Sequence, residues 1–261
     1  MAACVVSAAA PSCRGFRCLD REACFVYDAS TKIARLAHES DACDVEAATE
    51  ELTLPYITRV GTIERISIDK AQELMQCTYT SKLLFQSSRM LRNYAFWGFT
   101  DSLDEGFTTV AMAHDAWGLV SDDVAIGHAV MLDGVDDDED NGLGLFATAA
   151  LTSGTFLGEY TGMVQVSADT ATRHDPYGVV YPSVYERGGL RVSAFEFGNE
   201  MRCINHSAEP NAHFTPMIRR GILHIYCSQF TTRAVESGEQ IFVNYGTSYW
   251  KGAGVDPVAA C

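Results

Sequence analysis

The segment from Arg202 to Asn211 constrains this chain more than any other, because several polar side chains stand in a fixed order within it. It reads R-C-I-N-H-S-A-E-P-N, and residues 239–246 downstream read E-Q-I-F-V-N-Y-G. A third segment, residues 141–146, reads N-G-L-G-L-F. An isolated histidine is more often a structural hydrogen bonder than a catalyst, but the complete string at a set distance before a Tyr-Gly pair rarely arises by chance. We therefore interpret the three segments together.

From Gly127 onward, short apolar runs alternate with glycine, proline and charged turns, a pattern typical of many short strands. The runs are Ala129 to Leu132, Gly144 to Ala147, Thr155 to Tyr160, Gly189 to Val192, Gly221 to Tyr226 and Gln240 to Tyr245. They predict a mainly β domain with some α structure.

The first part of the chain has a different pattern. Apolar residues between Asp69 and Tyr94 recur at helical spacing, and Asp69 with Gln72 imitates a capping box, which predicts a helix or a helical pair. Asp44 to Leu52 also favours a helix, and the β-branched residues of Tyr56 to Ile68 favour a strand. We expect an α-rich or mixed region over residues 1–118, without chemistry of its own, then a domain over residues 119–250 and a tail over residues 251–261.

Charge and composition limit the partners. The formal net charge of −15 argues against direct nucleic-acid binding, which needs a basic surface. It favours basic partners, although acidity that serves only solubility explains the same charge. No apolar run approaches the roughly 20 residues of a membrane span, so no membrane partner is expected.

The nine cysteines are odd in number and scattered, which fits reduced thiols in the nucleus or the cytoplasm. The alanine-rich start lacks a basic n-region, so a secretory signal is disfavoured and a disordered terminus is the simpler interpretation. An organelle transit peptide stays open, because Arg14 and Arg17 have no acidic residue near them before Asp20.

Two clusters resemble metal sites only loosely. Cys13, Cys18, Cys24 and Cys43 lack the close pairs that usually bind structural zinc. The acidic run from Asp136 to Asp140 lacks the spacers of a calcium loop and is more simply a solvated turn.

The glycine pair at Gly142 and Gly144 does not build a dinucleotide site. Such a site needs a third glycine opening a helix, but position 147 is Ala147 and the next residues lead into another strand. In a different site, the two glycines would let the backbone approach a ligand closely.

Taken together, the three segments resemble the SET-domain protein-lysine methyltransferases over roughly residues 120–250. The resemblance implies a β-clip fold with a knot-like core, and S-adenosylmethionine as co-substrate. It implies that the cofactor contacts fall on these residues: Gly142, Leu143, Gly144, Arg202, Asn205, His206, Tyr245 and Trp250.

Tyr160 and Tyr245 are the catalytic residues that the resemblance implies. Glu159-Tyr160-Thr161-Gly162 matches the family's E-Y-x-G segment, and Tyr245 matches the tyrosine of its terminal Tyr-Gly motif. The family's crossing chain segments bring the two phenols to one end of a narrow channel. For Tyr160 taken alone, packing in the core with a satisfied hydroxyl is the competing interpretation.

The same resemblance implies a substrate channel at Phe214, Val243 and Tyr181. Residues 163–201 form a short insert whose aromatic residues are candidates for one wall of the substrate groove: Tyr177, Tyr181, Tyr185, Phe195 and Phe197. Neither Phe214 nor Val243 offers an extra hydroxyl, which favours the addition of more methyl groups.

The chain departs from many relatives at the end of the domain. Ala208 stands where they have a cysteine, and only Cys261 follows the domain, so no post-SET zinc site and no metal is expected. We expect Trp250 to pack over the adenine or the channel mouth, with ordinary tail packing as the alternative.

The expected reaction is methyl transfer from S-adenosylmethionine to the side-chain amine of a protein lysine, with histones as the leading substrate class. Such an in-line displacement needs neither a metal nor a covalent enzyme intermediate, so positioning supplies much of the acceleration. The alternative is a catalytically weak SET-fold module that serves as a protein-interaction platform.

Overall fold

The computed structural model describes residues 4–5, 16–18, 25–28, 33–36, 53–81, 83–85, 120–129, 142–166, 174–181, 190–219, 222–229 and 234–254. Within this part of the chain, the strands form five sheets. Helical structure is confined there to α1 (Ile68–Met75), the 3-10 helix η5 (Glu200–Cys203) and α3 (Thr247–Ala253). The mainly β architecture with some helix that was expected from the sequence is confirmed.

The largest sheet joins all three motif segments. Its order is β16 (Asn205–His206), β19 (Gln240–Val243), β10 (Leu143–Ala147), β9 (Val124–His128), β5 (Thr53–Ile57) and β6 (Ile63–Ser67). The central strands β9 and β10 are almost wholly buried, which suits their apolar, glycine-containing sequences. Strand β16 runs parallel to β19, so Asn205 lies opposite Phe242 and His206 opposite Val243.

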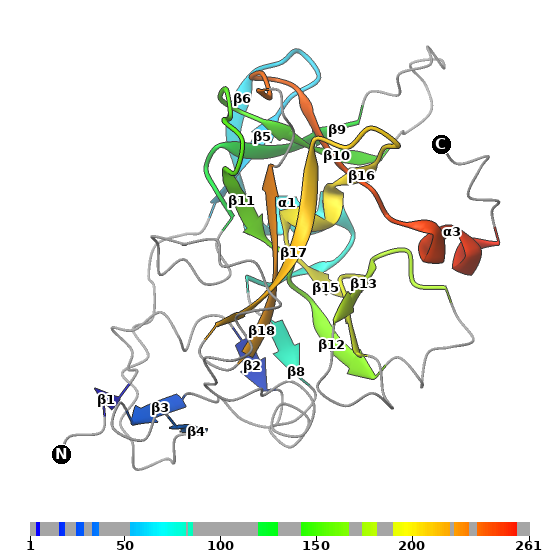
Figure 1. The fold of residues 1–261 in the computed structure, drawn as a ribbon. Helices are drawn as coiled ribbons and strands as arrows, with labels where there is room; N and C mark the ends of the chain where they lie inside the picture. Colours follow the sequence, from blue (N-terminus) through cyan, green and yellow to red (C-terminus); the bar gives the residue numbers. More distant parts are fainter. Residues whose placement is uncertain are drawn as a thin grey trace.

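A long antiparallel hairpin runs down the middle of the molecule (Figure 1). It consists of β17 (Ala212–Arg219) and β18 (Ile222–Gln229), and β11 (Phe156–Glu159) pairs with β18 on its other side. Phe214 lies on β17 of this sheet, and Tyr160 is the first residue after β11.

The insert contributes most of the five-stranded sheet. Its order is β13 (Gly178–Tyr181), β14 (Leu190–Ser193), β12 (Met163–Val166), β8 (Leu83–Phe85) and β2 (Phe16–Cys18). Strand β13 is an edge strand, and β8 joins β12 in parallel register. Two further sheets pair β15 (Phe197–Gly198) with β7 (Thr78–Tyr79), and β3 (Phe25–Asp28) with both β1 (Cys4–Val5) and β4 (Ile33–Leu36).

The helix predicted from Asp69 to Tyr94 is right only for its beginning. Helix α1 starts after Ser67, whose Oγ accepts a hydrogen bond from the backbone N–H of Lys70, and ends at Gln76 in a left-handed conformation. Beyond it lie strands β7 and β8, because pairing with β15 and β12 outweighs the local helical spacing.

Most of the predicted strands are present. Strands β11 and β19 lie within the runs identified from sequence, and β10, β14 and β18 overlap theirs. The run from Tyr56 to Ile68 is divided between β5 and β6, which form a hairpin. The predicted helix at 44–52, most of the strand at 129–132 and the acidic run at 136–140 lie outside the described residues.

The described part of the N-terminal segment packs into the same core as the later strands. Leu54, Met75 and Phe85 belong to one apolar cluster with Ile126 and Leu145. Strand β5 also pairs with β9, across the expected division between residues 118 and 119. That division stays a prediction, but the segment before it supplies sheet and core to the segment after it.

Candidate active site

Tyr160 is held where the chain leaves strand β11. Its side chain is buried, and its hydroxyl donates a 2.7 Å hydrogen bond to the backbone carbonyl of Tyr177. The ring of Phe214 meets the Tyr160 ring edge-on, with the centroids 5.3 Å apart. The backbone N–H of Tyr160 donates to the carbonyl of Ile225 on β18. The phenol is therefore fixed by its hydroxyl, its ring and its backbone.

Tyr245 lies two residues beyond strand β19. Its hydroxyl donates a 2.7 Å hydrogen bond to the carbonyl of Ile204, and its backbone N–H donates to Nδ1 of His206 at 3.1 Å. Because Nδ1 accepts this bond, the neutral imidazole carries its proton on Nε2. Residues 204–206 thus hold Tyr245 through both its hydroxyl and its backbone N–H.

The phenols of Tyr160 and Tyr245 both have a raised pKa. Burial raises the pKa of Tyr160 and the pKa of Tyr245 well above the ordinary phenol value. Both side chains therefore stay neutral at physiological pH, and neither is suited to act as a strong base. Since each proton is donated to a backbone carbonyl, each oxygen presents its lone pairs as a hydrogen-bond acceptor.

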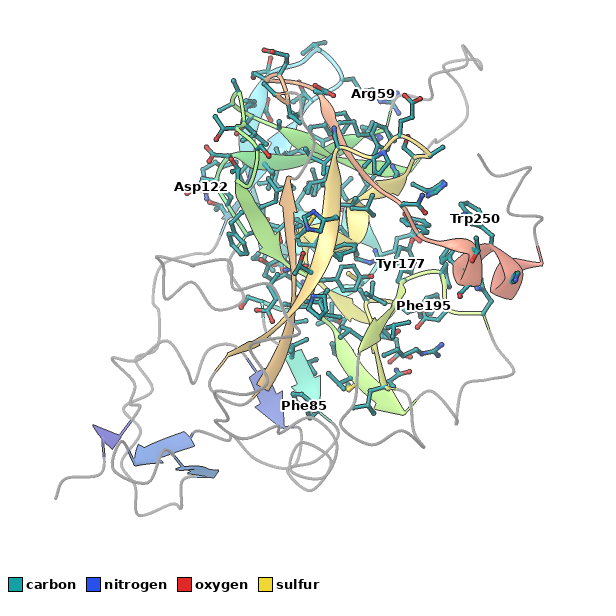
Figure 2. The ribbon with its side chains drawn as sticks, viewed as in Figure 1. Arg59, Phe85, Asp122, Tyr177, Phe195 and Trp250 are labelled. Atoms are coloured by element: carbon teal, nitrogen blue, oxygen red, sulfur yellow. The ribbon has the colours of Figure 1, made fainter. Side chains whose placement is uncertain are left out.

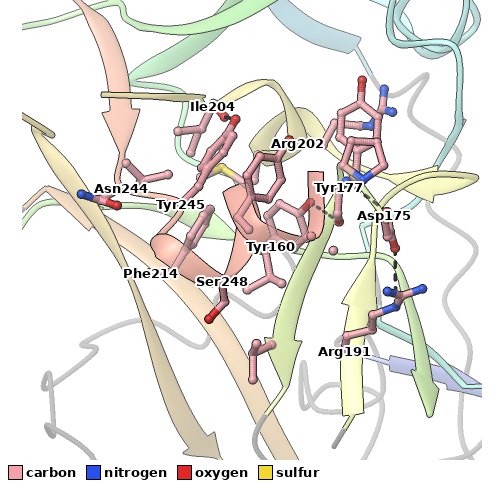
Figure 3. Close-up of a pocket in the computed structure, with 18 of the residues that line it drawn as sticks. Tyr160, Asp175, Tyr177, Arg191, Arg202, Ile204, Phe214, Asn244, Tyr245 and Ser248 are labelled. Carbon is pink, nitrogen blue, oxygen red and sulfur yellow. Dashed lines mark hydrogen bonds and ion pairs between the residues drawn. The ribbon is translucent and has the colours of Figure 1, made fainter. Parts of the chain in front are cut away.

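Tyr160 and Tyr245 line one cavity of about 770 Å³ (Figure 3). Phe214 and Val243, both expected in a substrate channel, also line it. The backbone of Tyr181 ends strand β13, but its side chain lies outside the described residues. The cavity wall combines aromatic and aliphatic side chains with a few polar groups, as ligand sites usually do.

Arg202 contacts other parts of the protein itself. Its guanidinium donates to the backbone carbonyls of Met75 and Ala194, and its central carbon lies 3.8 Å from the centroid of the Tyr177 ring. These contacts tie η5 to the end of α1 and to the insert. They give no support to the expected cofactor contact of Arg202, which stays a prediction.

The segments expected to bind the cofactor are joined to each other. The side-chain amide of Asn205 donates a 3.0 Å hydrogen bond to the carbonyl of Leu143, across the intervening strand β19. Gly142 has a positive φ of 74°, and a Cβ there would meet nothing within 4 Å. At Gly144, a Cβ would crowd the side chain of Gln240, so close packing explains this glycine.

Helix α3 places the rings of Trp250 and Tyr249 against Tyr245 (Figure 2 labels Trp250). The Trp250 ring stacks at 24° to the Tyr245 ring, with centroids 6.1 Å apart, and meets His206 edge-on at 5.0 Å. Its indole Nε1 is buried and has no hydrogen-bond partner among the described residues. Buried indole N–H groups usually have a partner, so this donor is a candidate for contact with a ligand.

Sequence reasoning missed the ion pair of Asp175 with Arg191. Their side chains are 8% and 18% exposed, and Oδ2 of Asp175 lies 3.6 Å from Nε of Arg191. Oδ1 of Asp175 accepts a 3.0 Å hydrogen bond from the N–H of Tyr177. The Asp-Pro pair before β13 is a turn signal that could have indicated this role. Tyr177, named only as a wall residue, contacts both Tyr160 and Arg202.

Neither a metal-ligand cluster nor a membrane-spanning helix is found in the described part of the chain. That part of the chain holds no group of three or more His, Cys, Asp or Glu side chains arranged for a metal ion. None of its helices is both long and apolar enough to cross a membrane.

Residues 142–246 match the family model of the SET domain. Over 109 residues the chain is 36% identical to the histone-lysine N-methyltransferase MEDEA of Arabidopsis thaliana, and the match covers 40% of this chain and 15% of MEDEA. Over 118 residues it is 31% identical to the histone-lysine N-methyltransferase EZH2 of Chaetomium thermophilum, covering 41% of this chain and 8% of that relative. The matched segment is thus a small part of each relative.

Solved structures with partial similarity include a complex called ctPRC2, in an autoinhibited conformation bound to S-adenosylmethionine. It is 24% identical with a TM-score of 0.40, and the match covers 49% of this chain and 16% of that one. Polycomb Repressive Complex 2 of Chaetomium thermophilum bound to GSK126 matches at 24% identity and a TM-score of 0.43, covering 56% and 18%.

Proposed function

Residues 142–246 of this chain form a SET domain, and we propose that the chain uses it to transfer the methyl group of S-adenosylmethionine to a lysine side chain of a protein. The observation that carries the proposal is that the buried phenol of Tyr160 and the partly buried phenol of Tyr245 line one cavity. Both donate their protons to backbone carbonyls, so both oxygens can accept hydrogen bonds from an amine.

Histones are the substrate class that we propose, because the matched relatives are named histone-lysine N-methyltransferases. A net charge of −15 favours a basic protein partner over nucleic acid. We accordingly propose that the protein acts in the nucleus or the cytoplasm.

S-adenosylmethionine, when bound, supplies an electrophilic methyl carbon on a positively charged sulfur. We propose that the residues holding it are Gly142, Leu143, Gly144, Asn205, His206 and Trp250. The residues present fit such a group in two respects. The indole N–H of Trp250 is buried without a described partner, and the space beside Gly142 is open.

The chain must present the lysine as a neutral amine. Removing its proton at pH 7 from a pKa near 10.4 costs about 4–5 kcal/mol. Burial between Phe214 and Val243 lowers this pKa, because an apolar wall disfavours the charged ammonium. The buried guanidinium of Arg202, which also lines the cavity, acts in the same direction.

The phenol oxygens then orient the neutral amine. Each oxygen can accept one amine N–H, which leaves the nitrogen lone pair free to point at the methyl carbon. This arrangement supplies positioning rather than acid–base chemistry, and the released proton passes to water.

The test is transfer of labelled methyl from S-adenosylmethionine to core histones and to a mixed cell extract, together with calorimetry of S-adenosylmethionine binding. Label on a histone band supports the proposal in full, and label on another protein supports lysine methylation with a different substrate. Binding without transfer would instead favour the protein-interaction module, and absence of both would contradict the proposal.

A further inference from the structure

Glu200 is a buried carboxyl at the start of η5, the 3-10 helix that leads into the N-H-S segment, residues 205–207. It is 3% exposed. Among the described residues, its carboxyl has one partner side chain, Tyr79, whose hydroxyl lies 3.2 and 3.4 Å from the two carboxyl oxygens. Tyr79 belongs to β7, so the contact joins the N-terminal segment to η5 across 121 positions of the sequence.

Tyr79 has a fixed position on its own side of this contact. Its backbone N–H donates a 2.9 Å hydrogen bond to Oε1 of Gln72 on α1. Strand β7 pairs with β15, which places Tyr79 opposite Gly198, two residues before Glu200. The Tyr79 hydroxyl therefore meets η5 from a defined place in the fold.

The other end of η5 holds groups of the active site. The N–H of Ile204 donates to the carbonyl of Met201 within η5, so Ile204 moves with this helix. The carbonyl of Ile204 accepts the hydroxyl of Tyr245 at 2.7 Å, and both residues line the cavity (Figure 3). A displacement of η5 would therefore shift the acceptor that orients the Tyr245 phenol.

Burial makes the charged form of Glu200 costly. It raises the pKa of this carboxyl from 4.5 to about 7, and the hydrogen bond from Tyr79 lowers the pKa by a smaller amount. The carboxyl is therefore protonated below about pH 7 in the folded protein and becomes ionised above it. An ionised carboxyl at this depth favours any displacement of η5 that brings it to water.

The surroundings of Glu200 do not supply a bonded cation. In the described part of the chain, the titratable and charged side chains on η5 and on the elements packed around it are Cys77, Tyr79, His128, Glu159, Arg202 and Cys203. The guanidinium of Arg202 donates to the backbone carbonyls of Met75 and Ala194. Burial raises the pKa of both thiols, so they stay neutral near pH 7. The ring of His128 packs on Tyr56.

We propose that Glu200 is a positioning residue: its protonated form holds η5 against Tyr79 and keeps the Ile204 carbonyl in place for Tyr245, so methyl transfer weakens when Glu200 ionises. This inference rests on the function proposed above. It gives the N-terminal segment a part in the reaction through β7.

The test is the pH profile of labelled-methyl transfer to core histones between about pH 6 and pH 8, taken as the ratio of the wild-type rate to the Glu200→Gln rate. Glutamine keeps an acceptor for Tyr79 and cannot ionise. Dividing by its rate cancels the titration of the substrate lysine and of other groups such as His128. The ratio is expected to fall about 3- to 10-fold as the pH rises through about 7, the rate equivalent of one hydrogen bond.

Tyr79→Phe separates titration of Glu200 from a general effect on packing. It removes the hydrogen bond that lowers the pKa of Glu200, so the midpoint of the fall is expected at a higher pH. Its rate is divided by that of the double variant Tyr79→Phe/Glu200→Gln. Glu73→Gln, on the exposed face of α1, should keep the wild-type profile.

A ratio that stays constant over this pH range would overturn the inference, as would an unchanged midpoint in Tyr79→Phe. Should Glu200→Gln fail to fold by circular dichroism, the midpoints of wild type and Tyr79→Phe decide by the same criterion.

Amide hydrogen exchange of residues 199–206 gives a readout that does not depend on transfer. Relative to Glu200→Gln, the wild type should be less protected at about pH 8 than at about pH 5. Equal relative protection at both pH values would also overturn the inference. Failure of the proposed function has a different signature, because the wild type would then label no protein at any pH while the exchange difference remains.

Discussion

The side-chain amide of Asn205 donates a 3.0 Å hydrogen bond to the backbone carbonyl of Leu143, 62 residues earlier in the chain. This bond joins the N-H-S segment to the glycine segment across strand β19. It links the two parts of the chain that we propose to bind the same ligand.

Asn205→Ala is therefore expected to weaken S-adenosylmethionine binding about tenfold, since it leaves the Leu143 carbonyl unsatisfied and frees the two segments. Calorimetry measures the dissociation constant. Asn211→Ala is the matched control. Asn211 is also a buried asparagine, but among the described residues its side chain is hydrogen-bonded to Glu239, Gln240 and Phe242, and these bonds do not reach the glycine segment. It should lower thermal stability and leave the affinity nearly unchanged; an equal loss of affinity in both variants would contradict the assignment.

Gly162, in the segment after Tyr160, has no room for a side chain. A Cβ there would collide with the backbone carbonyl of Ser193, which cannot move without disturbing the pairing of β12 with β14. Gly162→Ala is expected to cost more than about 3 kcal/mol of unfolding free energy, in the range of overpacked cores.

Gly154 is the control for that change. It also has a positive φ, of 81°, but a Cβ there would meet nothing within 4 Å. Gly154→Ala should cost only about 1 kcal/mol, the conformational penalty alone. Denaturant unfolding compares the two, and equal costs would show that the collision at Gly162 is relieved.

Glu200 makes the stability of the fold depend on pH. The carboxyl is 3% exposed and accepts the hydroxyl of Tyr79, and burial raises its pKa from 4.5 to about 7. The folded protein thus holds this proton more tightly than the unfolded chain does. The resulting stability is fully present below pH 4.5 and is lost as the pH rises through about 7, by up to about 3 kcal/mol.

Glu200→Gln keeps an acceptor for Tyr79 but cannot ionise. The variant is expected to be more stable than wild type at pH 8 and similar at pH 4.5, as measured by urea unfolding at both pH values. Glu73→Gln, on the exposed face of α1, should leave the pH dependence unchanged. Parallel pH dependence of wild type and Glu200→Gln would show that Glu200 is not the titrating group.

Trp250 offers a test of the proposed cofactor side of the site. Trp250→Ala removes the ring that stacks on Tyr245 and the unpartnered indole N–H. We expect S-adenosylmethionine affinity to fall about tenfold, a typical loss for a well-packed aromatic contact. Lys251→Ala, on the exposed face of the same helix, should bind as wild type does. Retained affinity in Trp250→Ala would support ordinary packing of the tail instead.

The β-rich part of the fold was accessible from sequence because short apolar runs between turn residues report strands directly. The predicted helix was wrong at Thr78–Tyr79 and Leu83–Phe85, since β7 and β8 owe their conformation to partners more than 60 residues away, and residues 86–94 lie outside the described part. Strand pairing at such separations leaves no local signal in the residues themselves.

In the candidate site, too, only the features with a local sequence signal were predicted. Motif matching predicted the phenols Tyr160 and Tyr245, and the cavity contains both. It did not predict the ion pair of Asp175 with Arg191 or the position of Arg202 over the Tyr177 ring, because each joins residues that lie well apart in the sequence. Short motifs carry the reacting groups, whereas the groups that position them are scattered.

The most direct test of the account compares Tyr245→Phe with Tyr56→Phe in the transfer of labelled methyl to core histones. Tyr245 lines the cavity, and Tyr245→Phe removes the hydroxyl that donates to Ile204, whereas Tyr56 lies on β5, edge-on to His128 and outside the cavity lining. The account predicts a loss of at least about tenfold for Tyr245→Phe, the rate equivalent of one hydrogen bond, and wild-type transfer for Tyr56→Phe. Equal transfer by both variants would contradict the assignment of Tyr245 as a catalytic residue.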